Sequence, residues 1–247
     1  MTDASRPDVV RRAVAEAVGS GLLVAAVIGS GIAASRLSPD DRGLQLLENS
    51  IATGAALVAL ILALQPISAA FNPVVTLAER AFGLVTTVEA AALIAAQLVG
   101  AICGAVVANL MFDLDAVSFS AHDRTGGGLW LGEVVATFGL VLLVFGSLRS
   151  GRPDRVAYTV GGYIAAAYWF TSSTSFANPA VTVARMFSDT FAGIAPSSVP
   201  AFVGAQLVGG AIGLGLIRVL YPTLVSPGVV GAVGEPTTTP RRTEGVR

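Results

Sequence analysis

Long apolar runs alternate with short polar loops along this chain. A helix needs about 20 apolar residues to cross a hydrocarbon core of about 30 Å. Two further apolar stretches, 72–83 and 178–188, have only about half that length, so each can enter a membrane as a helix but cannot cross it. The pattern therefore predicts two half-length helices and six membrane-spanning helices, over residues 9–34, 44–64, 88–112, 129–148, 156–170 and 200–220.

Both half-length stretches open with nearly the same residues. The first begins Asn-Pro-Val-Val-Thr at 72–76, and the second begins Asn-Pro-Ala-Val-Thr at 178–182. Asn is a favoured N-cap, and Pro is favoured at the first helical position because its missing N–H would be unpaired there anyway. Each motif follows apolar sequence with no polar linker. We therefore expect two helices that begin inside an apolar environment.

The two halves of the chain repeat one another beyond this motif. Glu16 in the first span returns as Glu133 in the fourth, and Ala-Gln-Leu-Val-Gly occurs at 96–100 and at 205–209. Each half contains three spans, and because three is odd, the second copy must be inverted in the membrane. We expect repeats at 9–112 and 129–222 within one domain (9–222), with the half-helix N-termini meeting at the midplane. The flanks are a polar tail at 1–8 and a disordered tail at 223–247.

The orientation follows from the arginines, which supply all 15 basic residues. Basic residues favour the cytoplasmic side of a membrane. With both termini inside, the outside has only Arg36, Arg42, Arg124 and Arg185. The cytoplasmic side then has Arg6, Arg11, Arg12, Arg80, Arg149, Arg152, Arg155, Arg218, Arg241, Arg242 and Arg247. We therefore expect a multi-pass protein of the inner (plasma) membrane with both termini cytoplasmic.

Composition agrees with this and excludes several function classes. Only 13% of residues are charged and 53% are hydrophobic, whereas soluble domains have roughly 25% charged residues. A net charge of −1 suggests no nucleic-acid partner. Cys103 and His122 are single residues of their types, which excludes a disulfide framework, a Cys₄ metal site and chemistry that needs several histidines. We expect no cofactor, no metal and no enzymatic activity.

Two helix N-termini that face each other place partial positive charge at the membrane centre. If the oxygen of each Asn side chain caps its helix, the NH₂ group is left as a donor. A neutral molecule with an acceptor oxygen can bind such a donor, and a cation is repelled. This predicts a conduit for small uncharged polar solutes. A plainer interpretation, that Asn-Pro only begins two ordinary helices, is disfavoured because the motif recurs at matching positions.

These motifs resemble the major intrinsic protein family, the aquaporins and aquaglyceroporins, over roughly residues 9–222. The resemblance implies an all-α membrane protein with six transmembrane helices and two re-entrant half-helices in an inverted repeat. It also implies one pore per chain, contact with membrane lipid and a homotetramer. Val74 stands where Ala is usual, and Ala70 where His is usual. The pore midplane would comprise Asn72, Pro73, Val74, Asn178, Pro179 and Ala180.

Glu16 and Glu133 lie in apolar helices, where an ionisable residue is a functional candidate by default. One interpretation is a proton or cation relay. The other is a buried acceptor for backbone N–H groups of the re-entrant segments, and the family resemblance implies this structural role.

The expected selectivity filter departs from the family pattern. The family normally has Arg directly after the second Asn-Pro-Ala, and Val181 occupies that position, as in a bacterial branch associated with arsenic handling. Counting back without gaps places the other filter positions at Ala52, Ala166 and Ser175. We expect Arg185 to pair with Asp189 in the outer vestibule. The mouth would then be wide and poor in donors, which favours glycerol, urea or neutral metalloid hydroxides such as arsenous acid.

Two other classes of function stay open at this point. An ion-coupled secondary transporter or an ion channel can also be built on an inverted repeat. It would need an ion-coordinating charge near the midplane, and the pore-facing stretches offer none. An intramembrane enzyme, or a structural junction protein without solute flux, is the remaining alternative.

Overall fold

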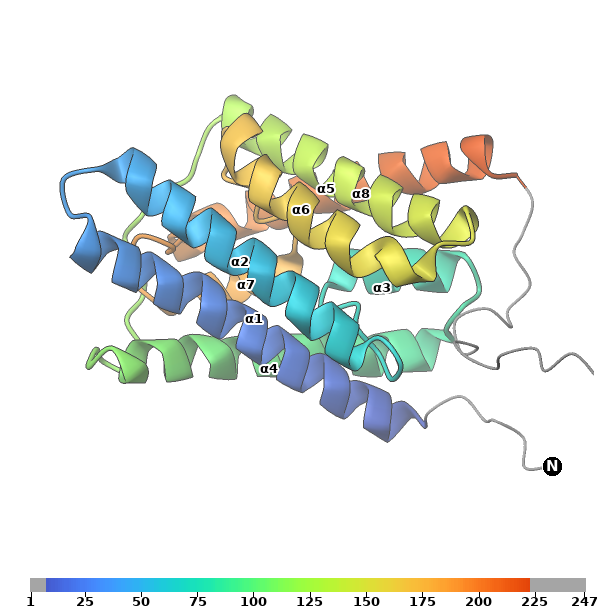
Figure 1. Cartoon of the computed structure of the whole chain (residues 1–247), viewed down its shortest axis with the longest axis horizontal. Helices are drawn as coiled ribbons and strands as arrows, with labels where there is room; N and C mark the ends of the chain where they lie inside the picture. Colours follow the sequence, from blue (N-terminus) through green and yellow to red (C-terminus); the bar gives the residue numbers. More distant parts are fainter. Residues whose placement is uncertain (1–7, 223–247) are drawn as a thin grey trace, which may run out of the picture.

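The computed structural model describes residues 8–222, and within this range every regular element is helical (Figure 1). The tail expected at 223–247, and residues 1–7 of the tail expected at 1–8, lie outside the described residues. The short 3₁₀ turns are η1 (Pro153–Arg155) and η2 (Pro196–Ser198). The α-helices are α1 (Val9–Leu37), α2 (Arg42–Leu64), α3 (Pro73–Ala81), α4 (Thr87–Met111), α5 (Gly127–Arg149), α6 (Val156–Phe170), α7 (Pro179–Arg185) and α8 (Val199–Leu220).

Five of the described helices, namely α1, α2, α4, α5 and α8, are long and apolar enough to cross a membrane. The sixth predicted span, α6, has 15 residues, which corresponds to about 22 Å of helix. It follows η1 directly, so the helical path begins three residues earlier. The membrane-embedded bundle and its two half-helices therefore follow the pattern predicted from the sequence.

Small residues allow the long helices of each half to pack closely. A Cβ at Gly100 or Gly104 of α4 would collide with the backbone oxygens of Ala17 and Gly21 in α1. In the second half, a Cβ at Gly209 of α8 would collide with the oxygen of Val134 in α5. Packing α1 on α4 and α5 on α8 at such short separations keeps both pairs rigid around the centre.

The half-helices α3 and α7 begin near the middle of the molecule and extend toward opposite ends (Figure 1). Both predicted N-caps are confirmed. Asn72 Oδ1 accepts a hydrogen bond from the Val74 amide at 3.0 Å, and Asn178 Oδ1 accepts from the Ala180 amide at 3.0 Å. The start of α1 and the end of α8 lie at the same end of the bundle (Figure 1).

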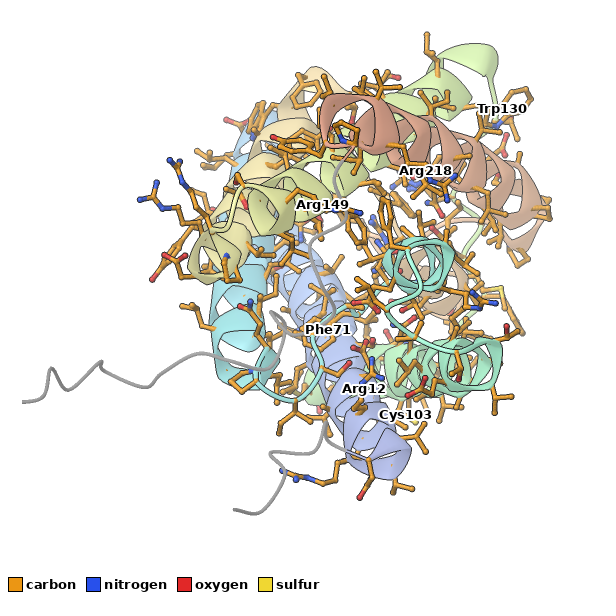
Figure 2. All side chains as sticks on the ribbon, turned by 90° about the vertical axis from the view of Figure 1, so that its right-hand side faces the viewer. Arg12, Phe71, Cys103, Trp130, Arg149 and Arg218 are labelled. Atoms are coloured by element: carbon orange, nitrogen blue, oxygen red, sulfur yellow. The ribbon has the colours of Figure 1, made fainter. Side chains whose placement is uncertain are left out.

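That shared end faces the viewer in Figure 2. There Arg149 and Arg218 both lie over the Phe82 ring, with guanidinium carbons 4.7 and 5.8 Å from its centroid. Cys103 is exposed on α4 and does not pack in the core. At the opposite end, the loop between α4 and α5 is tied to the segment after α7, because Ser120 donates its amide hydrogen to Met186 O at 2.9 Å.

Candidate functional site

Two non-helical segments lead into the half-helices, and their backbones are unusual in the same way. Phe71 and Ala177, the residues before the two asparagines, have φ angles of 47° and 48°. A non-glycine residue in this left-handed region costs about 1–3 kcal/mol, so it persists only where its surroundings hold it. The carboxylates of Glu16 and Glu133 supply that restraint.

Glu16 is fully buried in α1 and accepts four hydrogen bonds. Its Oε1 accepts from Ser68 Oγ at 2.6 Å and from the Ala70 amide at 2.8 Å, and its Oε2 accepts from the Phe71 amide at 2.7 Å. Gln97 Nε2 of α4 donates to the same Oε2 at 2.8 Å. One carboxylate therefore anchors the whole segment before α3 through charge-assisted hydrogen bonds.

Glu133, fully buried in α5, does the same in the second half. The Phe176 and Ala177 amides donate to it at 2.8 Å each, and Gln206 Nε2 donates at 2.6 Å. Neither glutamate lines the pocket described below. The geometry supports the interpretation of both acids as buried acceptors rather than as a proton or cation relay.

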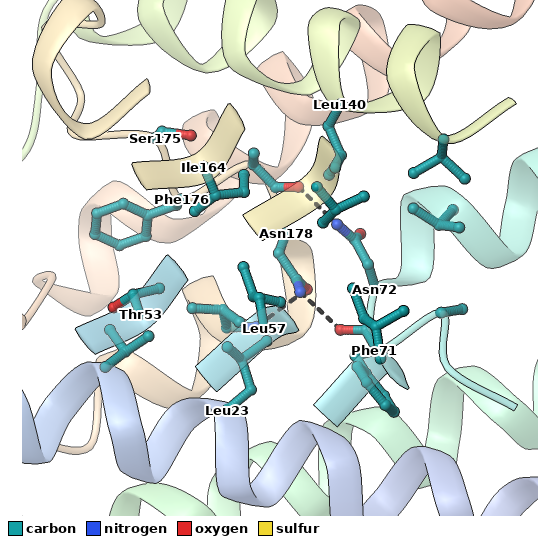
Figure 3. A pocket seen from close by; sticks show the side chains of 18 of the residues that line it. Leu23, Thr53, Leu57, Phe71, Asn72, Leu140, Ile164, Ser175, Phe176 and Asn178 are labelled. Atoms are coloured by element: carbon teal, nitrogen blue, oxygen red, sulfur yellow. Dashed lines mark hydrogen bonds between the residues drawn. The ribbon is translucent and has the colours of Figure 1, made fainter. Parts of the chain in front are cut away.

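The two asparagines cross-link the half-helix entrances (Figure 3). Asn72 Nδ2 donates to Ala177 O, and Asn178 Nδ2 donates to Phe71 O, both at 2.7 Å. The sequence interpretation left the whole NH₂ group free, which the structure corrects. One N–H of each amide is used in the cross-link, and the second is left for a ligand.

A pocket passes this asparagine pair and extends from Val156, at the start of α6, to Tyr168 near its end. That length corresponds to about 18 Å of helix. Its lining includes two continuous stretches, 69–72 and 175–178, which precede and include the two asparagines. The rest of its wall is largely aliphatic, formed by Leu23, Val27, Leu57, Ile61, Val75, Leu140, Val144, Val156, Val160 and Ile164.

The other residues predicted at the midplane lie behind the pocket wall. Pro73, Val74, Pro179 and Ala180 are buried but do not line the pocket. The side chain of Val74 fills the space that a Cβ at Gly210 of α8 would need. These four residues belong to the first turns of the half-helices, directly after the asparagines, and their place at the pore midplane stays a prediction.

Two of the four predicted filter positions do not line this pocket. Ser175 and Val181 line the pocket, but Ala52 is half-buried and Ala166 is exposed, and neither lines it. Thr53 and Tyr168 take their places, with their hydroxyls 3.2 Å apart. A shift of one residue rotates a helical position by about 100°, and a shift of two by about 200°. An ungapped count cannot determine that rotation.

Arg185 lies in the pocket wall, contrary to the vestibule position expected from the sequence. It is 2% exposed, its guanidinium carbon is 3.4 Å from the Phe176 ring centroid, and its Nε donates to Ala192 O. Asp189, the expected partner, instead accepts from the Ala121 amide at 2.9 Å. Helical side chains lean toward the N-terminus, which carries the guanidinium back toward Val181. We call the end of the pocket near Tyr168 its outer end, and with Arg185 in its wall this end is not poor in donors.

A second arginine supports this end from outside the pocket wall. Arg124, in the loop before α5, donates from Nε to Gly193 O at 2.8 Å and from Nη2 to Phe191 O at 3.4 Å. Its guanidinium carbon is 5.0 Å from the same Phe176 ring. Burial lowers the pKa of Arg124 to about 10, so it remains charged at neutral pH. Nothing in the local sequence distinguishes this arginine from an ordinary loop residue.

Comparisons with known proteins agree with this architecture. Residues 3–166 match the family model described as "Major intrinsic protein". The chain is 52% identical over 212 residues to "Aquaglyceroporin AqpS" of Rhizobium meliloti (strain 1021), covering 85% of this chain and 90% of that protein. It is 28% identical over 231 residues to "Probable aquaporin TIP-type" of Medicago truncatula, covering 89% and 90% of the two chains.

Among solved structures, the X-ray structure of the aquaglyceroporin from Plasmodium falciparum superposes with a TM-score of 0.67 at 18% identity. The match covers 87% of this chain and 98% of that one, and at this identity it concerns the fold alone. The matching model spans more than half of the chain, and the Rhizobium relative is matched over most of its length. With its paired Asn-Pro half-helices around one pocket, this chain belongs to the major intrinsic protein family.

Proposed function

We propose that this integral membrane protein is a passive channel for small uncharged solutes, including water and glycerol-like polyols, with one pore per subunit. The observation that carries the proposal is the pocket that runs past the cross-linked asparagines of two facing half-helices. Each asparagine offers one N–H beside an aliphatic wall. A solute with hydroxyl or carbonyl oxygens finds donors on one side and apolar surface on the other.

Charged species are disfavoured in this pathway for two reasons. The N-termini of α3 and α7 and the guanidinium of Arg185 repel cations. Any ion that sheds its water between the aliphatic walls also loses hydration that these walls cannot replace. Among the described residues, no Asp or Glu lines the pocket, which argues against the coupling-ion site that a secondary transporter needs.

The solute cut-off is set, in this proposal, by the side chains at the outer end of the pocket. Thr53 and Tyr168 close one side as a hydrogen-bonded pair, and Ser175, Val181 and Arg185 form the rest. This filter is narrower and more polar than the set expected from the sequence. It suits glycerol and urea, and arsenous acid, a small neutral trihydroxide, belongs to the same size class.

The orientation and assembly belong to the same proposal. The arginines at the shared end of α1 and α8 support a cytoplasmic location for that end, in a plasma membrane. Exposed apolar side chains cover the outer faces of the spans, Val10, Val88, Val99 and Val219 among them. Such faces suit lipid or neighbouring subunits, consistent with a homotetramer.

Stopped-flow uptake in proteoliposomes tests the function. Reconstituted protein should speed glycerol, urea and water entry, and collapsing proton and sodium gradients should not change the rates. Val181→Trp should fill the outer end of the pocket and abolish the added flux. Val208→Trp is the matched control, because Val208 is 52% exposed on α8 and lies outside the pocket.

Accumulation of solute against its own gradient would contradict a passive channel. Equal loss of flux in both tryptophan variants would show that the described pocket is not the pathway.

A further inference from the structure

Two guanidinium groups gather at the outer end of the pocket, and among the described residues neither is in salt-bridge contact with a carboxylate. Arg124 and Arg185 approach the same Phe176 ring from different elements, the loop before α5 and the last turn of α7. Their hydrogen bonds within the described residues go to backbone oxygens of the segment after α7. Within residues 8–222, neither guanidinium forms an ion pair with an acid.

The acids of this region accept hydrogen bonds from other groups. Glu133, which attracts both guanidinium groups through space, accepts from the Phe176 and Ala177 amides. Asp189 accepts from the Ala121 amide, and Asp123 accepts from Ser198 Oγ and Thr125 Oγ1 at 2.8 Å each. A buried charge normally has a charged partner, because an isolated ion loses its hydration on burial. Among the described residues, neither Arg124 nor Arg185 has a carboxylate in direct contact.

Two donor side chains without a full set of partners line this end of the pocket. The Nε of Arg185 is held by Ala192 O, and within the described chain the Nη groups make no further hydrogen bond. Ser175 lines the pocket at 2% exposure, and its hydroxyl has no partner among the described residues. Ser175 and Thr53 lie at the same end of the pocket in Figure 3, away from Asn72.

The part of the pocket around the asparagine pair disfavours an ion, because most of its wall is aliphatic. The side chains that line it around the asparagine pair in Figure 3 include Leu23, Leu57, Leu140 and Ile164. A small anion can thus exchange its hydrating water for hydrogen-bond donors at the outer end of the pocket. If it moved further into the pocket, it would lose those donors and contact aliphatic carbon instead, which is unfavourable.

We propose that the outer end of the pocket is a binding seat for a small planar oxyanion, held by Arg185 and Ser175, and that the bound anion blocks solute entry without passing through. A guanidinium presents parallel N–H groups that match two oxygens of a planar oxyanion. The blocking part of the proposal rests on the proposed channel function, whereas binding does not.

Nitrate is a suitable probe, because it is planar and stays ionised at neutral pH. Glycerol uptake into proteoliposomes is measured with external sodium nitrate against sodium gluconate at the same ionic strength. Nitrate should slow the wild-type flux, and gluconate, which is too bulky for the seat, should not. In Arg185→Gln the half-inhibitory nitrate concentration should rise by about tenfold or more, as expected for losing a charged hydrogen-bond donor.

Arg36→Gln is the matched control. Arg36 also lies over a phenylalanine, 5.2 Å from the Phe112 centroid, and donates to Phe112 O at 2.6 Å, but it does not line the pocket. Its nitrate sensitivity should equal that of the wild type. Ser175→Ala should give a smaller loss than Arg185→Gln. If Arg185→Gln does not fold, Arg185→Lys keeps the charge without the planar fork and should still weaken nitrate binding.

A second measurement separates this proposal from the channel function. Nitrate should raise the thermal unfolding temperature of the purified wild-type protein in detergent, and should do so less in the Arg185 variants. If solute flux is absent but nitrate still raises the unfolding temperature, the proposed channel function is wrong and the proposed anion-binding site is supported. If the wild type and the Arg185 variants respond equally to nitrate, the proposed binding site is wrong. If nitrate enters the liposomes through the protein, the proposal that the anion blocks the pore without passing through is wrong.

Discussion

The segments around α3 and α7 have the same scaffold but different chemistry. In both, an Asn caps the half-helix, the preceding residue is left-handed, and a buried Glu-Gln pair holds the entrance. Gln97 Nε2 also reaches Thr76 Oγ1 at 2.9 Å, and Gln206 Nε2 reaches Thr182 Oγ1 at 2.8 Å. The backbone of one half is thus repeated closely in the other.

The pocket-facing positions differ between the same two segments. Where the second half has Ser175 and Phe176, the first has Ala69 and Ala70. Arg185 lines the pocket, whereas Glu79, its counterpart in the repeat, does not. The two halves therefore share the backbone scaffold that encloses the pocket from both sides. The polar side chains that line the pocket and select solutes are concentrated at one end.

Packing behind the half-helices also differs. In the first half Val74 fills the space beside Gly210, one of several glycines of α8. In the second half Ala180 stands at the position of Val74, and Ala101 of α4 stands at the position of Gly210. The pair Val–Gly contains one side-chain carbon more than the pair Ala–Ala, a change that a packed core registers, so the packing behind the two half-helices is not equivalent.

The largest expected effect comes from breaking what the halves share. Glu16→Gln and Glu133→Gln each turn a carboxylate that accepts several charge-assisted bonds into an amide that donates toward backbone N–H groups. Each such bond is worth about 1.5–3 kcal/mol, so we expect loss of folded protein in both variants. Thermal unfolding and size-exclusion profiles in detergent measure this.

Glu48→Gln serves as the control, since Glu48 Oε1 accepts one bond, from Ser38 Oγ at 3.0 Å, near the end of the bundle. It should change the unfolding temperature much less. A Glu133→Gln protein as stable as Glu48→Gln would refute the anchoring role.

An intermediate effect is expected from the packing difference. Gly210→Ala places a methyl group against Val74 and should destabilise the fold by about 1–3 kcal/mol, as overpacking does. Adding Val74→Ala recreates the Ala–Ala pair of the second half and should recover most of that loss. The coupling is measured by a double-mutant cycle of unfolding free energies. Additive effects of the two changes would show that Val74 and Gly210 do not compete for the same space.

The smallest expected effect distinguishes the two ends of the pocket. Arg185→Ala removes a bulky donor from the outer end and should raise the rate of a five-carbon polyol relative to glycerol by about tenfold, a typical discrimination by pocket size. Glu79→Ala makes the equivalent truncation in α3 and should leave the ratio unchanged. Paired uptake rates in proteoliposomes give this ratio. A larger change in the Glu79 variant would place the size limit at the other end.

The sequence alone determined the helical elements and their symmetry. Apolar run length separates the spans from the half-helices, and Asn-Pro marks a helix start through contacts within a few residues. The repeated Glu and Gln positions indicated two matching halves. These signals are local or periodic, so they survive without knowledge of the packing.

Tertiary structure decided which side chains face the pocket. Thr53 and Tyr168, rather than Ala52 and Ala166, face it because packing sets the rotation of each helix about its axis. Arg185 enters the wall because Ala192 and Phe176, from segments on either side of α7, hold its guanidinium there. Such positions depend on contacts between segments that are distant in sequence. The hydrophobic pattern of a single sequence does not report those contacts.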